Sequence, residues 1–241
     1  MRRLISCYFC PPGAPRDWET FARRLQLSAR RHNPAWSIEV FEVSTEGRRG
    51  GAEGYYRANT HKLEAWVAAA CAAPDGDEIA LLDADTMVLG SLDEVWATAF
   101  DVAITMRAVS RRFPHVFPFN AGVVFLRVSP AIRAFMWAWA AENARMLEDR
   151  QHHRRFQPRY GGINQSALGF LRESGAMDAL AVLEIPCQRW NCEDSTWERF
   201  DAQTRILHIK GDLRRTALGI GRGSTVCRPL AALWQSLEAA P

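Results

Sequence analysis

The stretch Ile79-Ala80-Leu81-Leu82-Asp83-Ala84-Asp85-Thr86 decides the fold of this chain. Its first four residues are apolar without interruption, which predicts a strand buried on both faces. Two carboxylates, Asp83 and Asp85, follow two residues apart, so they point the same way. In an open parallel sheet, ligands collect outside the carboxyl ends of the strands. The pair therefore lies where a hard divalent cation and a diphosphate could meet.

The alternative role for this pair is to cap a helix. The segment Ser91-Leu92-Asp93-Glu94 opens a helix just beyond it, and Asp is common before a helix start. A cap needs only one carboxylate, however, and it would lie next to the helix instead of upstream of the apolar Met87-Val88-Leu89. A D-x-D triplet alone is weak support because chance matches are frequent. The metal interpretation is favoured once the later motifs are added.

Length and composition bound the class of protein. With 241 residues, 48% of them hydrophobic, we expect one globular domain over residues 1–241 and exclude disorder and fibre. The net charge of +3 is too small for a general nucleic-acid binder. The apolar run near the N-terminus is too short for a signal peptide, and no stretch approaches the roughly 20 residues of a membrane span. We expect a cytoplasmic protein with no transmembrane segment.

Two periodicities alternate along the chain. Apolar and β-branched runs predict strands at 4–9, 37–43, 79–82, 102–106, 122–127, 181–185 and 206–209. Helical patterns occupy 17–31, 55–72, 92–97, 130–150, 164–173 and 228–239, with Ser129 as N-cap before Pro130. This alternation predicts an α/β fold with a mostly parallel central sheet and helices on both faces. Irregular stretches at 46–54, 110–119, 151–162 and 219–224 are expected to be site loops.

Cysteines and a basic segment offer further sites, each with a simpler alternative. Cys7 and Cys10 are spaced C-x-x-C and Cys187 and Cys192 form a wider pair, but buried thiols are favoured over structural zinc. The basic, aromatic-tipped segment at 149–160 could hold an anionic acceptor or a membrane surface. A solvated loop after the preceding helix is the more common outcome.

Five motifs, in order between Tyr56 and Arg214, resemble those of nucleotide-diphospho-sugar glycosyltransferases with the GT-A fold, most closely the retaining family 8. The metal-strand motif covers 81–96, and Phe119-Asn120-Ala121-Gly122-Val123 is similar to "F-N-[AS]-G-V". Asn164-Gln165 resembles the "D-Q" helix start, with Asn164 in place of Asp and Gly169 in place of the motif's final Asn. The last two are Ile185-Pro186 with Trp190-Asn191, similar to "L-P…[WY]-N", and His208-Ile209-Lys210-Gly211, similar to "H-x-x-G".

The resemblance implies a set of site residues. Asp83, Asp85 and His208 would bind Mn²⁺ or Mg²⁺, with Ala84 between the carboxylates. Asn120, Ala121, Gly122, Asn164 and Gln165 would lie against the donor sugar, Asn120 and Gln165 as catalytic residues. Gly211, Lys210, Arg214 and Lys62 would contact the donor. This chain departs from the family at two points: Arg214 occupies the position of a family Lys, and the "K-P-W" ending is absent. The expected donor is a UDP-sugar, and retention is expected because Gln165 cannot deprotonate an acceptor.

Physical chemistry agrees with this transfer. A departing nucleoside diphosphate needs a dication and positive side chains to stabilise its charge. A mixed oxygen and nitrogen site suits Mn²⁺, and arginine can hold a phosphate bidentately. Each of these residues also has a simpler structural interpretation: His208 as an ordinary strand histidine, Lys62 as a surface residue, Asn120 as a turn residue and Gln165 as a helix cap.

Two other functions stay open from the sequence. A nucleotidyltransferase should carry a Gly-rich basic signature after the first strand, where Cys10-Pro11-Pro12-Gly13 gives no convincing pattern. A nucleotide-binding protein without turnover is suggested by Asn164 and the missing "K-P-W" ending. The acceptor, whether a glycan, a lipid-linked glycan, a protein or a small molecule, cannot be read from the sequence.

Overall fold

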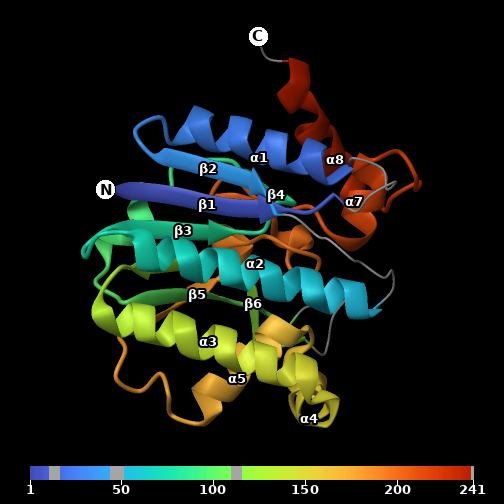
Figure 1. Cartoon of the computed structure of the whole chain (residues 1–241). Helices are drawn as coiled ribbons and strands as arrows, with labels where there is room; N and C mark the ends of the chain where they lie inside the picture. The colour runs from blue at the N-terminus through green and yellow to red at the C-terminus, as the bar shows by residue number, and fades with distance from the viewer. Residues whose placement is uncertain (11–16, 44–51, 110–115, 240–241) are drawn as a thin grey trace.

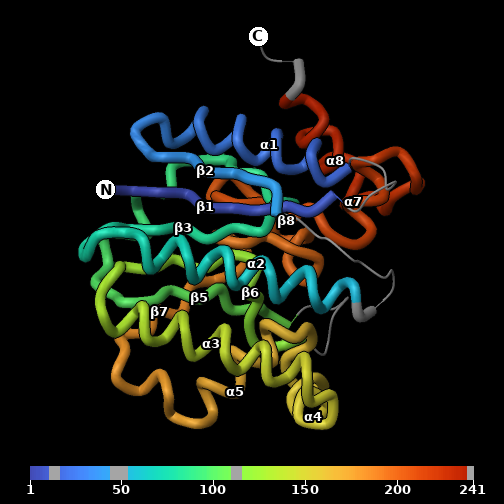
Figure 2. The backbone as a smooth tube through the Cα atoms, in the orientation of Figure 1, coloured from blue at the N-terminus to red at the C-terminus, as the bar shows by residue number. Residues whose placement is uncertain are grey.

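Six strands in the described part of the chain form one sheet in the order β2-β1-β3-β6-β5-β7. The computed structural model describes residues 1–10, 17–43, 52–109 and 116–239 (Figure 2). The strands are β1 (Arg2–Tyr8), β2 (Ser37–Glu42), β3 (Glu78–Leu82), β5 (Val102–Met106), β6 (Phe119–Arg127) and β7 (Val182–Pro186). Only β6 among them runs against the others, pairing antiparallel with both β3 and β5. The sheet is therefore mostly parallel, as predicted.

Helices cover both faces of this sheet because its strands carry apolar side chains on both sides. On one face Ile79 and Leu81 pack in a core with Trp66 of α2 (Ala52–Ala72) and Trp139 of α3 (Pro130–Glu148). The helix α5 (Ile163–Glu173) joins this layer, and α2 and α3 lie side by side in Figure 1.

The opposite face has its own core. There Ala80 and Leu82 pack with Leu25 of α1 (Asp17–His32), Trp96 of the short helix η1 (Asp93–Ala97) and Trp190 of α6 (Cys187–Trp190). Alternate residues of β3 thus enter opposite cores, which explains its unbroken apolar run. The predicted fold class, α/β with helices on both faces, is confirmed.

A second, two-stranded sheet lies beside the carboxyl edge of the main one. It pairs β4 (Thr86–Val88) antiparallel with β8 (Ile206–His208). A third core joins it to α1, α7 (Gly211–Ala217) and α8 (Cys227–Gln235), which is followed by η3 (Ser236–Ala239). The short helix η2 (Trp197–Arg199) also contributes to this core, and Figure 1 places α7 and α8 beside one end of α1.

Several sequence-based boundaries were wrong. The predicted loop at 151–162 is mostly the helix α4 (Arg150–Tyr160), which Asp149 caps by accepting hydrogen bonds from the amides of Gln151 and His152. The helix α2 begins within the predicted loop at 46–54, and β6 begins at Phe119, the end of the predicted loop at 110–119; residues 46–51 and 110–115 lie outside the described residues. The strand β4 and the helix α7 were not predicted, whereas the Ser129 cap of α3 is confirmed.

All six cysteines are free thiols, and in the described ranges none joins a group of three potential metal ligands. No helix within the described residues is both long and apolar enough to cross a membrane.

Candidate active site

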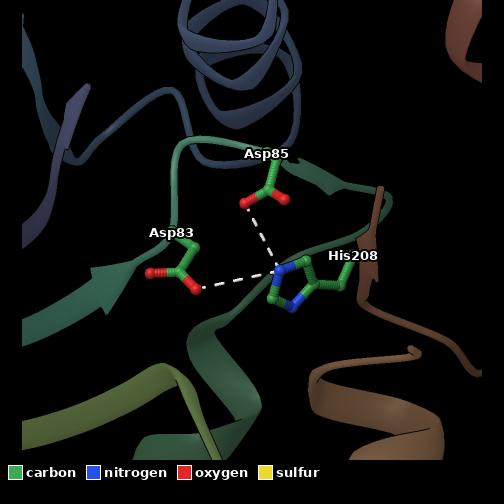
Figure 3. Close-up of side chains that lie close together, drawn as sticks. All are labelled: Asp83, Asp85 and His208. Carbon is green, nitrogen blue, oxygen red and sulfur yellow. Dashed lines mark ion pairs between the residues drawn. The ribbon is translucent and has the colours of Figure 1, made fainter. Parts of the chain in front are cut away.

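A tight turn after β3 presents the two carboxylates. The amide of Asp83 donates a 2.8 Å hydrogen bond to the carbonyl of Gly122 on β6, which continues the sheet pairing by one residue. The Thr86 hydroxyl donates to the carbonyl of Asp83 at 2.7 Å and closes the turn. The carboxylates of Asp83 and Asp85 both point towards His208 in Figure 3, but from a turn and not from the alternation of a strand, which ends at Leu82.

The pairing of β4 with β8 brings His208 to this turn. Thr86 lies opposite His208 in the antiparallel register, and the amide of Ile209 donates to the carbonyl of Asp85 at 2.6 Å. The Nε2 atom of His208 lies 3.3 Å from Asp85 Oδ1 and 3.7 Å from Asp83 Oδ2 (Figure 3). One ligand atom from each side chain falls within 4.8 Å of the others, so the three could hold a metal ion.

A basic side chain flanks each carboxylate. Lys62 of α2 donates to Asp83 Oδ1 at 2.5 Å, and Arg214 of α7 donates to Asp85 Oδ2. Burial opposes the charge of Lys62, but the neighbouring Asp83 outweighs it and raises the Lys62 pKa. Burial likewise opposes ionisation of Asp85, yet His208 and Arg214 hold the Asp85 pKa well below its usual range. Asp85 is thus ionised at neutral pH beside Arg214.

Gly122 and Asn120 form the floor of the site. A methyl group on Gly122 would lie 2.6 Å from Cε1 of His208, 2.7 Å from Oδ2 of Asp83 and 2.9 Å from Oδ1 of Asn120. These three side chains therefore crowd above the bare backbone of one glycine. Asn120 Oδ1 accepts a 2.8 Å hydrogen bond from the amide of Gly122, which fixes the side chain beside the carboxylates.

The start of α5 lies next to this floor. The Gln165 amide oxygen accepts a 3.4 Å hydrogen bond from the Ala121 amide, while its Nε2 donates to the carbonyl of Tyr160 at 2.7 Å. Gln165 therefore does not cap α5; its side chain bridges to β6. Asn164, at the predicted Asp position, is buried, and its Oδ1 accepts from the Gln165 amide at 3.0 Å.

The predicted tail residues Arg214 and Lys210 have different partners. Arg214 reaches Asp85, and its guanidinium carbon lies 4.6 Å from the centre of the Trp18 ring. Lys210 turns elsewhere, with Nζ at 2.7 Å from Glu193 Oε2 and 3.2 Å from Asp194 Oδ1. Gly211 has a positive φ of 53° at the start of α7, where the chain turns away from β8. Of the predicted tail residues, Arg214 thus lies beside the Asp83–Asp85 turn, whereas Lys210 pairs with two other carboxylates.

Sequence reasoning missed two residues behind the site. Asn191 Oδ1 lies 2.9 Å from His208 Nδ1, and Asn191 Nδ2 donates to the Thr105 hydroxyl at 3.0 Å. Asn191 belongs to the "[WY]-N" motif, so the sequence singled out this residue but did not indicate what its side chain does. Thr105 gave none, because Thr in a predicted strand is ordinary.

A cavity of about 540 Å³ opens along the same edge of the sheet. Its lining includes the apolar side chains of Phe117, Pro118 and Pro158 and the polar ones of Asp194 and Ser195. Tyr160, whose carbonyl accepts from Gln165, also lines it, so the cavity adjoins the start of α5. Its volume is within the range of about 300–1,000 Å³ typical of ligand pockets.

No protein-family model matches the chain, and no curated protein matches it. Among solved structures, a glycosyltransferase involved in the glycosylation of the major capsid of PBCV-1 is 9% identical with a TM-score of 0.58, the match covering 87% of this chain and 94% of that one. The glycosyltransferase GlyE of Streptococcus pneumoniae TIGR4 is 14% identical with a TM-score of 0.62, covering 100% and 60% respectively. This chain therefore spans about three fifths of GlyE.

A third similar structure is the galactosyltransferase LgtC, solved with donor and acceptor sugar analogs. It is 11% identical with a TM-score of 0.58, the match covering 99% of this chain and 95% of that one. At such identities the likeness concerns the fold. The chain has the GT-A-like α/β fold of these glycosyltransferases, with a possible Asp-x-Asp metal site at the edge of its sheet.

Proposed function

We propose that this protein is a metal-dependent glycosyltransferase of the family 8 type, a hexosyltransferase that uses a UDP-sugar with Mn²⁺ or Mg²⁺. The observation that carries the proposal is the convergence of Asp83, Asp85 and His208, from two sheets, on one point at the carboxyl edge. Asn120 and Gly122 adjoin that point, where a donor sugar would lie beside its own diphosphate.

The donor set fits a divalent cation. Two carboxylates and one imidazole nitrogen form the mixed site that Mn²⁺ accepts, and Mg²⁺ would rely on the carboxylates. When bound, the cation would neutralise charge that develops on the leaving diphosphate. The side chains would hold it from the β3 turn and from the end of β8.

The charges of the site balance for a cation and a diphosphate together. The two positive charges of Lys62 and Arg214 balance the two negative charges of Asp83 and Asp85, so the net charge of the four side chains is close to zero. A dication would add two positive charges, and a bridging diphosphate would compensate them. Arg214 would turn from Asp85 towards the phosphates, since its side chain is 32% exposed, whereas Lys62 at 9% would stay on Asp83.

The proposed reaction retains the configuration of the donor carbon. Gln165 is the polar side chain of the α5 start that faces β6, and an amide cannot act as the base that inversion requires. Its oxygen, next to the Ala121 amide, would stabilise positive charge at the sugar, and the leaving phosphate would take the acceptor proton. Proton NMR of the first product formed from an α-linked donor checks this, because a β-linked product contradicts retention.

We place the acceptor sugar in the cavity beside Tyr160. The ring of a saccharide could pack on Phe117 and Pro118, while its hydroxyls could bond to Asp194 and Ser195, which also line the cavity. The acceptor would thus be a glycan, free or attached to a lipid or protein that extends from the cavity.

Incubation with a panel of nucleotide sugars and Mn²⁺ tests the proposed function. The expected result is release of a nucleoside diphosphate, with UDP-sugars the best substrates. Asp85→Asn should abolish the release, whereas Asp75→Asn, which only alters an exposed ion pair with Arg133, should not. Pyrophosphate release would indicate a nucleotidyltransferase, and Mn²⁺-dependent nucleotide binding without turnover would indicate a binding protein.

A further inference from the structure

Four buried groups behind the candidate metal site form one chain of hydrogen bonds. The Thr105 hydroxyl of β5 donates to the backbone carbonyl of Asn120 at 2.7 Å. Asn191, the residue after α6, donates from Nδ2 to that hydroxyl at 3.0 Å, and its Oδ1 lies 2.9 Å from Nδ1 of His208. Thr105 and Asn191 are fully buried and Asn120 and His208 are nearly so. This series of hydrogen bonds therefore connects the strand proposed to face the sugar with a proposed metal ligand, and every group in it is buried.

The direction of every bond in this chain is fixed from one end. A backbone carbonyl can only accept, so the single hydroxyl proton of Thr105 is given to Asn120. The Thr105 oxygen can then only accept from Asn191, which turns the amide nitrogen of Asn191 towards Thr105 and its oxygen towards His208. Because that oxygen cannot donate, Nδ1 of His208 must carry the proton.

This assignment determines which His208 nitrogen has a free lone pair. With the proton on Nδ1, the lone pair of the neutral ring is on Nε2, the atom that faces Asp83 and Asp85. The other tautomer would place a proton where a cation needs a ligand. Metal-binding histidines usually donate their second nitrogen to such a partner, and loss of the partner typically weakens metal binding about 10- to 100-fold.

We propose that Asn191 is a positioning residue that holds His208 in the metal-binding tautomer, and that Thr105 orients Asn191 for this task. The inference rests on the proposed metal site, but the tautomer itself can be measured without turnover. It also explains why a polar Asn follows Trp190 in the fully buried region beneath the site.

The first test is ¹⁵N NMR of the imidazole nitrogens at pH 8.5, which distinguishes a protonated ring nitrogen from an unprotonated one. The His208→Gln variant assigns the signals. We expect wild-type His208 to carry its proton on Nδ1. A proton on Nε2 would overturn the proposal without any variant.

The second test compares variants by the same spectra and by calorimetric titration with Mn²⁺ alone. Asn191→Leu should give a mixture of tautomers and about 10- to 100-fold weaker Mn²⁺ binding. Asn191→Asp, which keeps an acceptor for Nδ1, should retain the tautomer. Thr105→Val, in which valine is close in shape to threonine, should increase the fraction of the other tautomer by less than Asn191→Leu does. It replaces Asn191→Leu in the test if that variant does not fold.

Asn143→Leu is the matched control, because Asn143 is equally buried and hydrogen-bonded, to Thr60 at 2.8 Å, but has no bond to the site. It should lose stability while His208 and Mn²⁺ affinity stay unchanged. An unaltered tautomer and affinity in folded Asn191→Leu would refute the proposal. If the wild type shows the Nδ1 proton, lost in Asn191→Leu, but no Mn²⁺ binding, the proposed function fails and the positioning role of Asn191 stands.

Discussion

Replacing Gly122 by alanine should disable the metal site with little change of fold. The added methyl group would lie 2.6 Å from Cε1 of His208 and 2.7 Å from Oδ2 of Asp83, where ordinary contact starts at 3.4 Å. Both neighbours are proposed metal ligands. The backbone of Gly122 has no positive φ, so the effect of the substitution comes from space and not from backbone strain.

The size of the effect follows from these distances. To reach ordinary contact, the His208 ring must retreat by about 0.8 Å and the Asp83 carboxylate by about 0.7 Å. Metal sites need ligand distances within about 0.2 Å of their ideal values, so these shifts are several times the tolerance. We expect a loss of Mn²⁺ affinity of more than about 100-fold, which is more than about 2.7 kcal/mol. Overpacking should lower the free energy of unfolding by only about 1–3 kcal/mol.

Calorimetric titration with Mn²⁺ and urea denaturation measure the two quantities separately. Gly162→Ala is the control, since a methyl group there would lie 3.7 Å from Oδ1 of Asn164 in ordinary contact and Gly162 has an extended backbone. It should bind Mn²⁺ like the wild type. Wild-type Mn²⁺ affinity in Gly122→Ala would refute the argument, because the ion could then not depend on the positions of His208 and Asp83.

Two further predictions concern charged groups. Arg214→Ala should lower kcat about 10²-fold or more, as for other donors that stabilise a developing anion. Lys210→Ala should mainly lower the melting temperature, because Lys210 pairs with the buried Glu193. Steady-state kinetics and thermal melts measure these two effects separately, and the reverse pattern would exchange the proposed roles of Arg214 and Lys210. Burial, with the nearby charge of Arg150, lowers the pKa of His153 below its ordinary 6.5, so protonation favours the unfolded chain and stability should fall as the pH drops below that value. Urea midpoints at pH 8 and pH 5.5 should differ less for His153→Leu than for the wild type, and an equal difference would assign the pH effect to other groups.

The sheet was predictable because its strands carry a strong local signal. β3 and β6 are apolar on both faces, since each supplies alternate residues to two cores, and this produces runs that no surface strand would have. The helix α4 was not predictable from its charges and Pro158. Its burial of His152, His153 and Tyr160 is a property of the packed layer, and polar histidines give no apolar stripe in the sequence.

The candidate site was only partly predictable for a similar reason. Asp83 and Asp85 follow a recognisable strand, so local sequence indicates their position. His208 reaches them through the pairing of β4 with β8, whose paired residues Thr86 and His208 are far apart in the chain. The three-residue strand β4 is too short to give a periodic signal, so only the motif resemblance pointed to this contact.

The division of labour between Arg214 and Lys210 illustrates what spacing alone cannot decide. Both follow His208 closely, and both are basic, yet Glu193 binds Lys210 and also accepts from Arg107 at 2.5 Å. Burial opposes ionisation of Glu193, but its hydrogen bond with Asp194 and the charges of Lys210 and Arg107 hold its pKa well below the usual range. A buried carboxylate of this kind cannot release its partners without a large cost. Lys210 and Arg107 are therefore committed to the structure, which supports the proposal that Arg214, beside Asp85, contacts the donor phosphates.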